Sequence, residues 1–134
     1  MENERLLEDG KRFHGHLGPY LALGLKAGAL ARERLKANPF KLKAEVHVRL
    51  EKPLSCFIDG VQVSSGCTMG KRNITAVDSD DIRVLFTCEQ QALEVKLRKE
   101  AQVWIQSLKV NKENEEQISR EIMNKKQEEL FEII

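Results

Sequence analysis

The apolar positions in the first third of the chain recur with helical spacing. Leu21, Leu25 and Ala29 fall on one stripe of residues 19–37, which predicts a helix of about five turns. Pro19 suits the first turn of this helix, because a missing N–H costs little at that position. A charged amphipathic segment at residues 3–12 predicts a shorter helix before it.

Two glycines lie on one face of the longer predicted helix. Gly24 and Gly28 are four residues apart, so they face the same side. Glycine inside a helix usually costs about 1 kcal/mol relative to alanine. Their spacing therefore suggests that another element packs closely against this face. The alternative is that two small residues are merely tolerated there.

The middle of the chain has the shorter periods that are typical of strands. Residues 44–50 alternate between apolar and polar side chains, which predicts a strand with one buried face. Residues 72–77 and 81–88 are also strand-like, and the turn-forming residues between them predict a hairpin. Residues 92–98 alternate again and are expected to add a third strand to this meander.

Helical patterns return on both sides of these strands. Residues 55–65 predict a short helix ended by Gly66, and residues 99–109 predict another. Residues 111–134 predict a C-terminal amphipathic helix that packs on the domain at residues 1–110 or on a dimer partner. The expected fold class is therefore α+β, a mostly antiparallel sheet flanked by helices.

Composition adds four limits to this picture. With 134 residues, 41% hydrophobic and 32% charged, the chain suits one globular domain with one core. A net charge of +1 lacks the basic excess of nucleic-acid-binding proteins. The chain contains no run of 18 apolar residues, so no membrane-spanning helix is predicted. The polar N-terminus is unlike a signal peptide, and a cytoplasmic location is therefore expected. Three cysteines suggest reduced thiols or metal ligands.

The candidate chemistry lies in two stretches that are far apart in sequence. The first is a loop at residues 13–19 with His14 and His16, and the second contains Cys56 and Cys67. Imidazole and thiolate are preferred ligands of zinc and similar divalent ions. These four residues can share one ion only if the fold brings the loop to the helix end. The alternative is that the histidines and cysteines are ordinary structural residues.

Two further interpretations use the stretch after the short helix. Glycines with Thr68 and Lys71 could cradle an anion, although the spacing is not that of a P-loop. Alternatively, Cys67 is a nucleophile with His14 or His16 as its base and Asp59 as an orienting group.

These stretches also carry a family resemblance. Residues 13–28, residues 56–73 and the ending at residues 128–133 resemble the FmdE family, which takes its name from formylmethanofuran dehydrogenase. The resemblance covers nearly the whole chain, in a short form that lacks the C-terminal zinc-binding module of some members. At Gly18, many relatives have a cysteine.

The resemblance implies a site, a cofactor and partners. It implies an α+β domain, often a homodimer, in which the metal-binding residues His14, His16, Cys56 and Cys67 converge on a divalent metal ion, expected to be zinc. Asp59, Gln62, Thr68 and Lys71 are expected nearby, and the candidate catalytic residues are Cys67, His16, Asp59 and Lys71.

The expected function follows from this resemblance. It is a metal-binding protein associated with formylmethanofuran dehydrogenase subunits or with related C1 metabolism and methanogenesis. The alternative is a non-catalytic assembly or partner-binding module with a structural His/Cys cluster. No nucleic-acid or membrane partner is expected.

Overall fold

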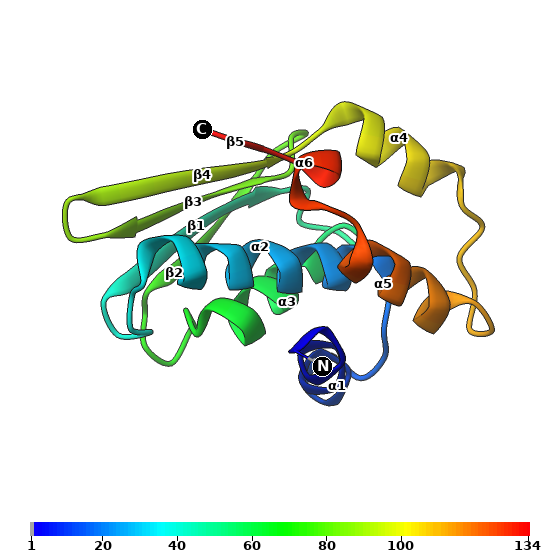
Figure 1. The fold of residues 1–134 in the computed structure, drawn as a ribbon, viewed down its shortest axis with the longest axis horizontal. Coiled ribbons are helices and arrows are strands. Elements are labelled where there is room, and N and C mark those ends of the chain that lie inside the picture. Colours follow the sequence, from blue (N-terminus) through cyan, green and yellow to red (C-terminus); the bar gives the residue numbers. More distant parts are fainter. Residues whose placement is uncertain (1) are drawn as a thin grey trace.

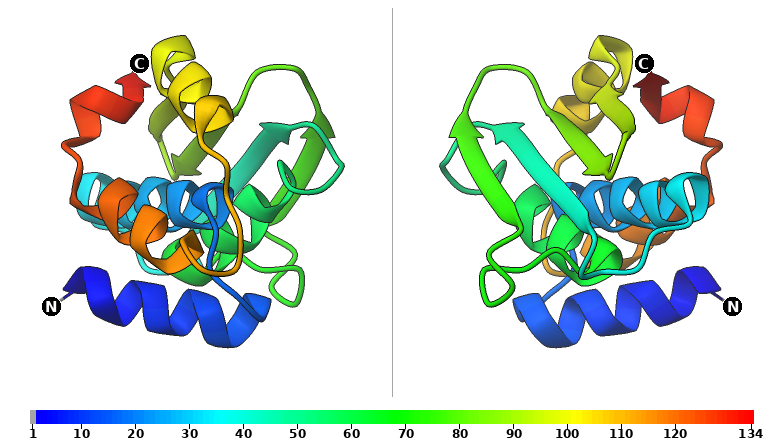
Figure 2. Two further views of the ribbon diagram at one scale, coloured as in Figure 1. Left: turned by 90° about the vertical axis from the view of Figure 1, so that its right-hand side faces the viewer. Right: turned by 90° about the vertical axis from the view of Figure 1, so that its left-hand side faces the viewer.

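The computed structural model describes residues 2–134, which form three layers (Figure 1). A five-stranded sheet lies on one side, helices α2, α3 and α5 form the middle layer, and α1 crosses beneath them (Figure 2). This arrangement confirms the expected α+β class. The elements are α1 (Glu2–His14), α2 (Pro19–Leu35), β1 (Leu42–Val48), α3 (Cys56–Ser65), β2 (Ile74–Asp78), β3 (Arg83–Cys88), β4 (Gln91–Leu97), α4 (Lys99–Ser107), α5 (Glu115–Asn124), α6 (Gln127–Leu130) and β5 (Phe131–Ile133).

Helices α2 and α3 pack backbone to backbone, which confirms the prediction from the glycine spacing. A Cβ atom added at Gly24 would lie 2.2 Å from the carbonyl oxygen of Phe57, and one added at Gly60 would lie 2.3 Å from that of Leu21. Both distances are far below van der Waals contact. Ser64 then donates a hydrogen bond of 3.1 Å to the carbonyl oxygen of Gly24. The absence of side chains therefore sets the distance between these helices.

The strand order in the sheet is β2-β1-β3-β4-β5, so the predicted hairpin between residues 72–77 and 81–88 is wrong. Strand β1 lies between β2 and β3, parallel to the first and antiparallel to the second. The predicted pairing of residues 81–88 with residues 92–98 is confirmed, because β3 and β4 are antiparallel neighbours.

The turn residues after β2 do reverse the chain, but they do so across the end of β1. Ser79 donates a backbone hydrogen bond of 3.2 Å to the carbonyl oxygen of Val48, the last residue of β1. Two strands separated by a third lie roughly 9.5 Å apart, which four extended residues can span. A short turn-rich connection therefore does not require its two strands to be neighbours.

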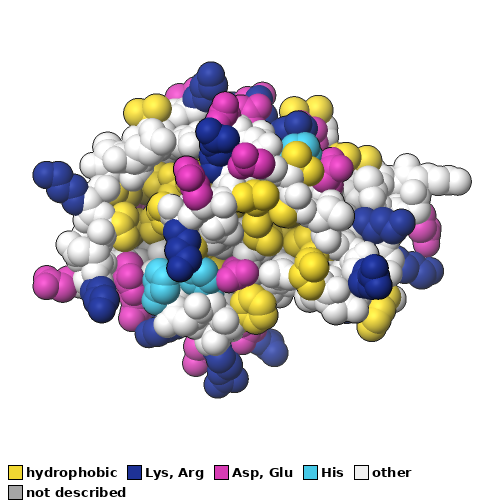
Figure 3. All heavy atoms as spheres, turned by 180° about the vertical axis from the view of Figure 1, so that it is seen from behind, with side chains coloured by type: hydrophobic (Ala, Val, Ile, Leu, Met, Phe, Trp, Pro, Cys, Tyr) yellow, Lys and Arg dark blue, Asp and Glu magenta, His cyan; other side chains and the backbone are white. Residues whose placement is uncertain are grey.

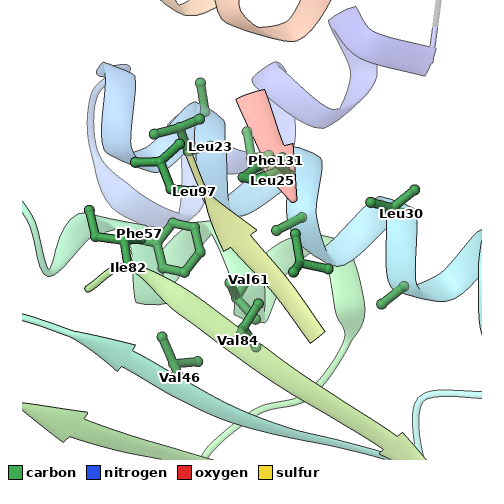
Figure 4. Packing of buried hydrophobic residues seen from close by; sticks show 14 of the residues in the cluster. Leu23, Leu25, Leu30, Val46, Phe57, Val61, Ile82, Val84, Leu97 and Phe131 are labelled. Carbon is green, nitrogen blue, oxygen red and sulfur yellow. The ribbon is translucent and has the colours of Figure 1, made fainter. Parts of the chain in front are cut away.

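One face of the sheet forms the core with α2 and α3. The inward side chains of the central strands, including Val46, Val84 and Leu97, are buried against residues such as Leu23 and Phe57 (Figure 4). The alternate residues face outward and are more polar. This pattern is the one expected of an antiparallel sheet with a single covered face.

The C-terminal segment is not the single amphipathic helix that was predicted for residues 111–134. It consists of α5, the one-turn helix α6 and the short strand β5. Ile118, Ile122 and Met123 of α5 are buried, and α5 packs on α2. The last apolar residues then switch to an extended conformation, because β5 pairs with the edge of β4, with Phe131 opposite Leu97. Among residues 2–134, no helix is long and apolar enough to cross a membrane.

Candidate functional site

A glycine turn brings the two histidines of the first motif together. His14 is the last residue of α1, and the backbone N–H of Gly15 donates to the carbonyl oxygen of Lys11. Gly15 has a φ of 110°, a conformation that glycine adopts without the steric penalty of a side chain. The chain therefore turns back at once, and the ring centroids of His14 and His16 lie 4.9 Å apart.

The hydrogen bonds of these rings determine which nitrogen carries the proton. Nδ1 of His14 lies 2.5 Å from a carboxylate oxygen of Asp59, and Nδ1 of His16 lies 2.9 Å from the carbonyl oxygen of Leu17. Both partners are acceptors, so each Nδ1 is the donor and each neutral ring keeps a lone pair on Nε2. Neither Nε2 has a hydrogen-bond partner among residues 2–134. Nδ1 held by an acceptor is the usual arrangement of metal-bound histidines.

Both imidazoles line an open pocket of about 500 Å³. In Figure 3, the two histidines lie side by side next to a hollow in which hydrophobic side chains are visible. The walls come from the start of α2, from the segment before α3, and from α4 with the loop that follows it. This volume and this largely apolar lining are in the usual range of small-molecule sites.

Cys56 lines the same pocket from the first turn of α3. Burial raises the pKa of its thiol, and the nearby carboxylate of Asp59 raises the pKa further. The free thiol is therefore protonated at neutral pH. Asp59 is one turn further along α3, as the sequence predicted, and also accepts a hydrogen bond of 3.4 Å from Gln62.

Cys67 lies at the opposite end of α3 and is not brought to the other three residues. The ten residues of α3 span about 15 Å, with Cys56 at the start and Cys67 beyond the end. Two thiolates on one zinc ion lie within roughly 4.6 Å of each other. Among residues 2–134, no three His, Cys, Asp or Glu side chains form a group that could hold a metal ion. The preassembled part of the site is thus the imidazole pair.

The loop around Cys67 is occupied with its own hydrogen bonds. The Cys67 thiol is fully buried and donates to the carbonyl oxygen of Leu42. The ammonium group of Lys71 donates to the carbonyl oxygen of Gly66 at 2.8 Å and to Thr68 at 3.4 Å. These contacts direct Lys71 and Thr68 into the loop itself. They stabilise the connection from α3 to β2 and leave no open anion cradle.

Several residues of the pocket were absent from the sequence-based set. Tyr20, Leu54 and Leu108 line it, and Glu115 lies 3.5 Å from Nδ1 of His16. Tyr20 directly follows the first motif, so its proximity was available from the sequence. The other three come from segments 38 to 99 positions away from His16, and only the fold brings them to the pocket.

The raised thiol pKa values predict slow alkylation. Iodoacetamide is expected to modify Cys56 more slowly than free cysteine at pH 7, because less of its thiol is ionised. Burial also raises the pKa of Cys67, and that thiol has no exposed surface, so it should react more slowly still. Both rates should rise with pH as the thiolates form. Mass spectrometry of the labelled peptides measures each rate, and a Cys67 faster than free cysteine would instead support its role as a nucleophile.

A comparison with known families matches most of the chain. The sequence profile described as "FmdE, Molybdenum formylmethanofuran dehydrogenase operon" matches residues 13–132. The chain belongs to the FmdE family. The match begins at the first residue of the histidine motif and ends within β5, so it includes both pocket histidines, Cys56 and the strands β1 to β4. The family description connects this domain with the formylmethanofuran dehydrogenase operon.

A curated relative is similar over part of this FmdE domain. The chain is 36% identical over 76 residues to a protein of Archaeoglobus fulgidus named "Probable S-adenosyl-L-methionine-binding protein". The aligned residues make up 55% of this chain and 21% of the relative. The chain thus spans about a fifth of that protein, and the ligand in its name belongs to the longer protein.

Proposed function

We propose that this FmdE protein binds a divalent metal ion, with zinc as the expected ion, in the pocket beside α3. His14, His16 and Cys56 would hold it. We propose that the protein acts through this site in C1 metabolism, beside the subunits of formylmethanofuran dehydrogenase. When bound, the ion would supply a Lewis acid to the pocket.

The pair of hydrogen bonds at the two imidazoles is the observation that carries this proposal. Asp59 and the Leu17 carbonyl each hold one Nδ1–H, so two Nε2 lone pairs are available from rings 4.9 Å apart. Two imidazoles and one thiolate match the ligand preference of zinc. Three protein ligands would leave one of its four positions for a water molecule or a ligand in the pocket.

Zinc binding to matched variants tests the proposal. We expect the metal-free wild-type protein to take up about one zinc ion per chain, because the two imidazoles lie 4.9 Å apart and the proposed third ligand, Cys56, lines the same pocket. Replacing His14 with alanine should weaken zinc binding by at least about 100-fold, more than the removal of an outer partner usually does. Cys56→Ser should also weaken it. Competition with a chromophoric chelator measures each affinity, and circular dichroism checks the fold.

Two further variants make this experiment specific. Cys67→Ser changes a thiol at the far end of α3 and should leave the zinc affinity unchanged. Gly18→Cys should increase the zinc affinity, because a Cβ at Gly18 would lie 3.9 Å from Cε1 of His16. The new thiol would then add a fourth ligand to His14, His16 and Cys56. Loss of zinc in Cys67→Ser with retention in His14→Ala would contradict the proposed site. No zinc in any variant would favour an assembly role.

A further inference from the structure

A row of polar side chains runs along one edge of the pocket, and Gln106 of α4 is a further polar residue of the lining. Asp59 contacts His14 at 2.5 Å, the rings of His14 and His16 lie 4.9 Å apart, and Glu115 lies 3.5 Å from His16. These four side chains form one continuous row. The larger part of the wall is aliphatic and comes from three separate segments, represented by Leu17, Leu21, Leu54, Ile105 and Leu108. A ligand that fills this pocket must therefore place most of its surface on hydrocarbon.

The charges around the pocket restrict the ligand further. No lysine or arginine lines it, whereas Glu115 does. Phosphorylated molecules need cationic side chains or clusters of backbone N–H groups around their phosphates. The start of α2 lines the pocket with one N–H fewer, because Pro19 has none, and at the start of α3 the N–H groups of Cys56 and Phe57 are already bonded to the carbonyl oxygens of Pro53 and Leu54. The phosphates of a nucleotide would also face the carboxylate of Glu115. In the metal-free protein, the lining thus favours a molecule without net negative charge.

Tyr20 supplies a second polar contact inside the apolar part. Its side chain lines the pocket and is only 6% exposed, yet no hydrogen-bond partner for its hydroxyl exists among residues 2–134. That oxygen is not completely enclosed, and the residue that carries it lines the pocket. Burial raises the pKa of the phenol, which therefore stays protonated and can both donate and accept.

We propose that the pocket binds an uncharged small molecule with an apolar body and one polar group that both donates and accepts hydrogen bonds. The polar group contacts polar side chains of the lining, among them Tyr20, and the body lies on the aliphatic walls. This inference names the ligand class of the pocket in the proposed function and rests on that function for its biological role. The binding energy of this small molecule comes from the burial of its hydrocarbon body, so its binding does not require the metal ion.

Primary amides of increasing length test this ligand class on the metal-free protein. Butanamide, pentanamide, hexanamide and heptanamide share one uncharged head that donates and accepts. Each added methylene is expected to improve the affinity about threefold to fourfold, the effect of burying one CH₂ group. Titration followed by two-dimensional ¹H–¹⁵N NMR gives each affinity. The shifted signals should belong to residues 17–21, 53–56 and 105–110, which line the pocket.

Matched variants and a charged analogue locate the contacts. Leu54→Ser should reduce the gain per methylene, whereas Leu50→Ser, at an exposed leucine outside the pocket, should not. Tyr20→Phe should weaken all the amides by about threefold to tenfold, as expected for one hydrogen bond. Hexanoate should bind roughly fivefold more weakly than hexanamide, because its charge faces Glu115.

The outcomes separate this inference from the metal site. Affinities that do not depend on chain length, or signals that shift mainly outside the pocket, would overturn it. Hexanoate binding more tightly than hexanamide would overturn the restriction to uncharged ligands. All titrations use metal-free protein, so a failure of zinc binding leaves these results unchanged. Conversely, zinc binding with no amide binding would support the metal site and refute the ligand class.

Discussion

Replacing Gly24 with alanine is expected to destabilise the protein by about 3 kcal/mol or more. The new Cβ would lie 2.2 Å from the carbonyl oxygen of Phe57 and 2.9 Å from Cα of Gly60, so both helices would have to move apart. Overpacking usually costs about 1–3 kcal/mol and occasionally more, and a clash with backbone atoms, which cannot rotate away, is expected to cost roughly 4 kcal/mol. Alanine gains only about 1 kcal/mol in helix propensity. The cost of the clash is therefore larger than the gain in helix propensity, and the substitution destabilises the protein.

Chemical denaturation of Gly24→Ala and Gly70→Ala measures this effect. A Cβ at Gly70 would meet only the hydroxyl of Thr68 at 3.9 Å, an ordinary contact, so this control should stay within about 0.5 kcal/mol of the wild type. The expected loss in Gly24→Ala corresponds to a Tm roughly 10 °C lower for a domain of this size. Equal stability of the two variants would mean that α2 and α3 are further apart than in this structure.

The same substitution also bears on the functional site. Helix α3 carries both Cys56 and Asp59, while the start of α2 carries Gly18 and Tyr20. Their relative positions depend on the close approach of the two helices at Gly24 and Gly60. A variant that stays folded with a wider crossing should therefore have weaker contacts along the pocket edge.

Phe131→Ala is expected to cost about 3–5 kcal/mol of stability, the usual effect of removing a buried phenylalanine side chain. Phe131 is only 1% exposed and lies in β5, which adds a fifth strand to the sheet next to β4 (Figure 4). Its removal would leave a cavity in the core that the C-terminal segment closes. Thermal or chemical unfolding of the variant measures the loss.

Ile134→Ala provides the matched control in the same segment. Ile134 is also apolar but is 69% exposed, so its truncation should change the stability by less than about 0.5 kcal/mol. Similar small losses in both variants would show that β5 is not anchored in the core. A large loss in Phe131→Ala alone would establish that the last residues of the chain are part of the folded domain.

Local patterns in the sequence were sufficient to predict most helices and strands. They were also sufficient to predict that the two histidines of the candidate site lie close together. The apolar stripe that predicted a helix at residues 19–37 corresponds to α2 within two residues, and Pro19 is its first residue. Helical period and turn chemistry depend on neighbouring residues, so they can be seen without the fold. The proximity of His14 and His16 has the same origin, because a single glycine turn lies between them.

Pairings between distant segments could not be derived in this way. The residues after β2 indicated a chain reversal, but only the structure shows that β1 lies between β2 and β3. Likewise, the apolar residues at the C-terminus indicated burial, and pairing with the edge of β4 decided that they form a strand. Strand neighbours are set by the burial of whole faces, which no local pattern records.

The sequence by itself determined the family and the α+β class, and it identified the histidines and cysteines that are candidates for a functional site. The tertiary structure alone decided which of those residues meet. It places Cys56 in the lining of the pocket that also contains the imidazole pair, it places Cys67 at the far end of α3, and it brings Leu108 and Glu115 to the pocket. The reason is physical: residue type specifies what a side chain can bind, whereas helix length and packing specify where that side chain lies.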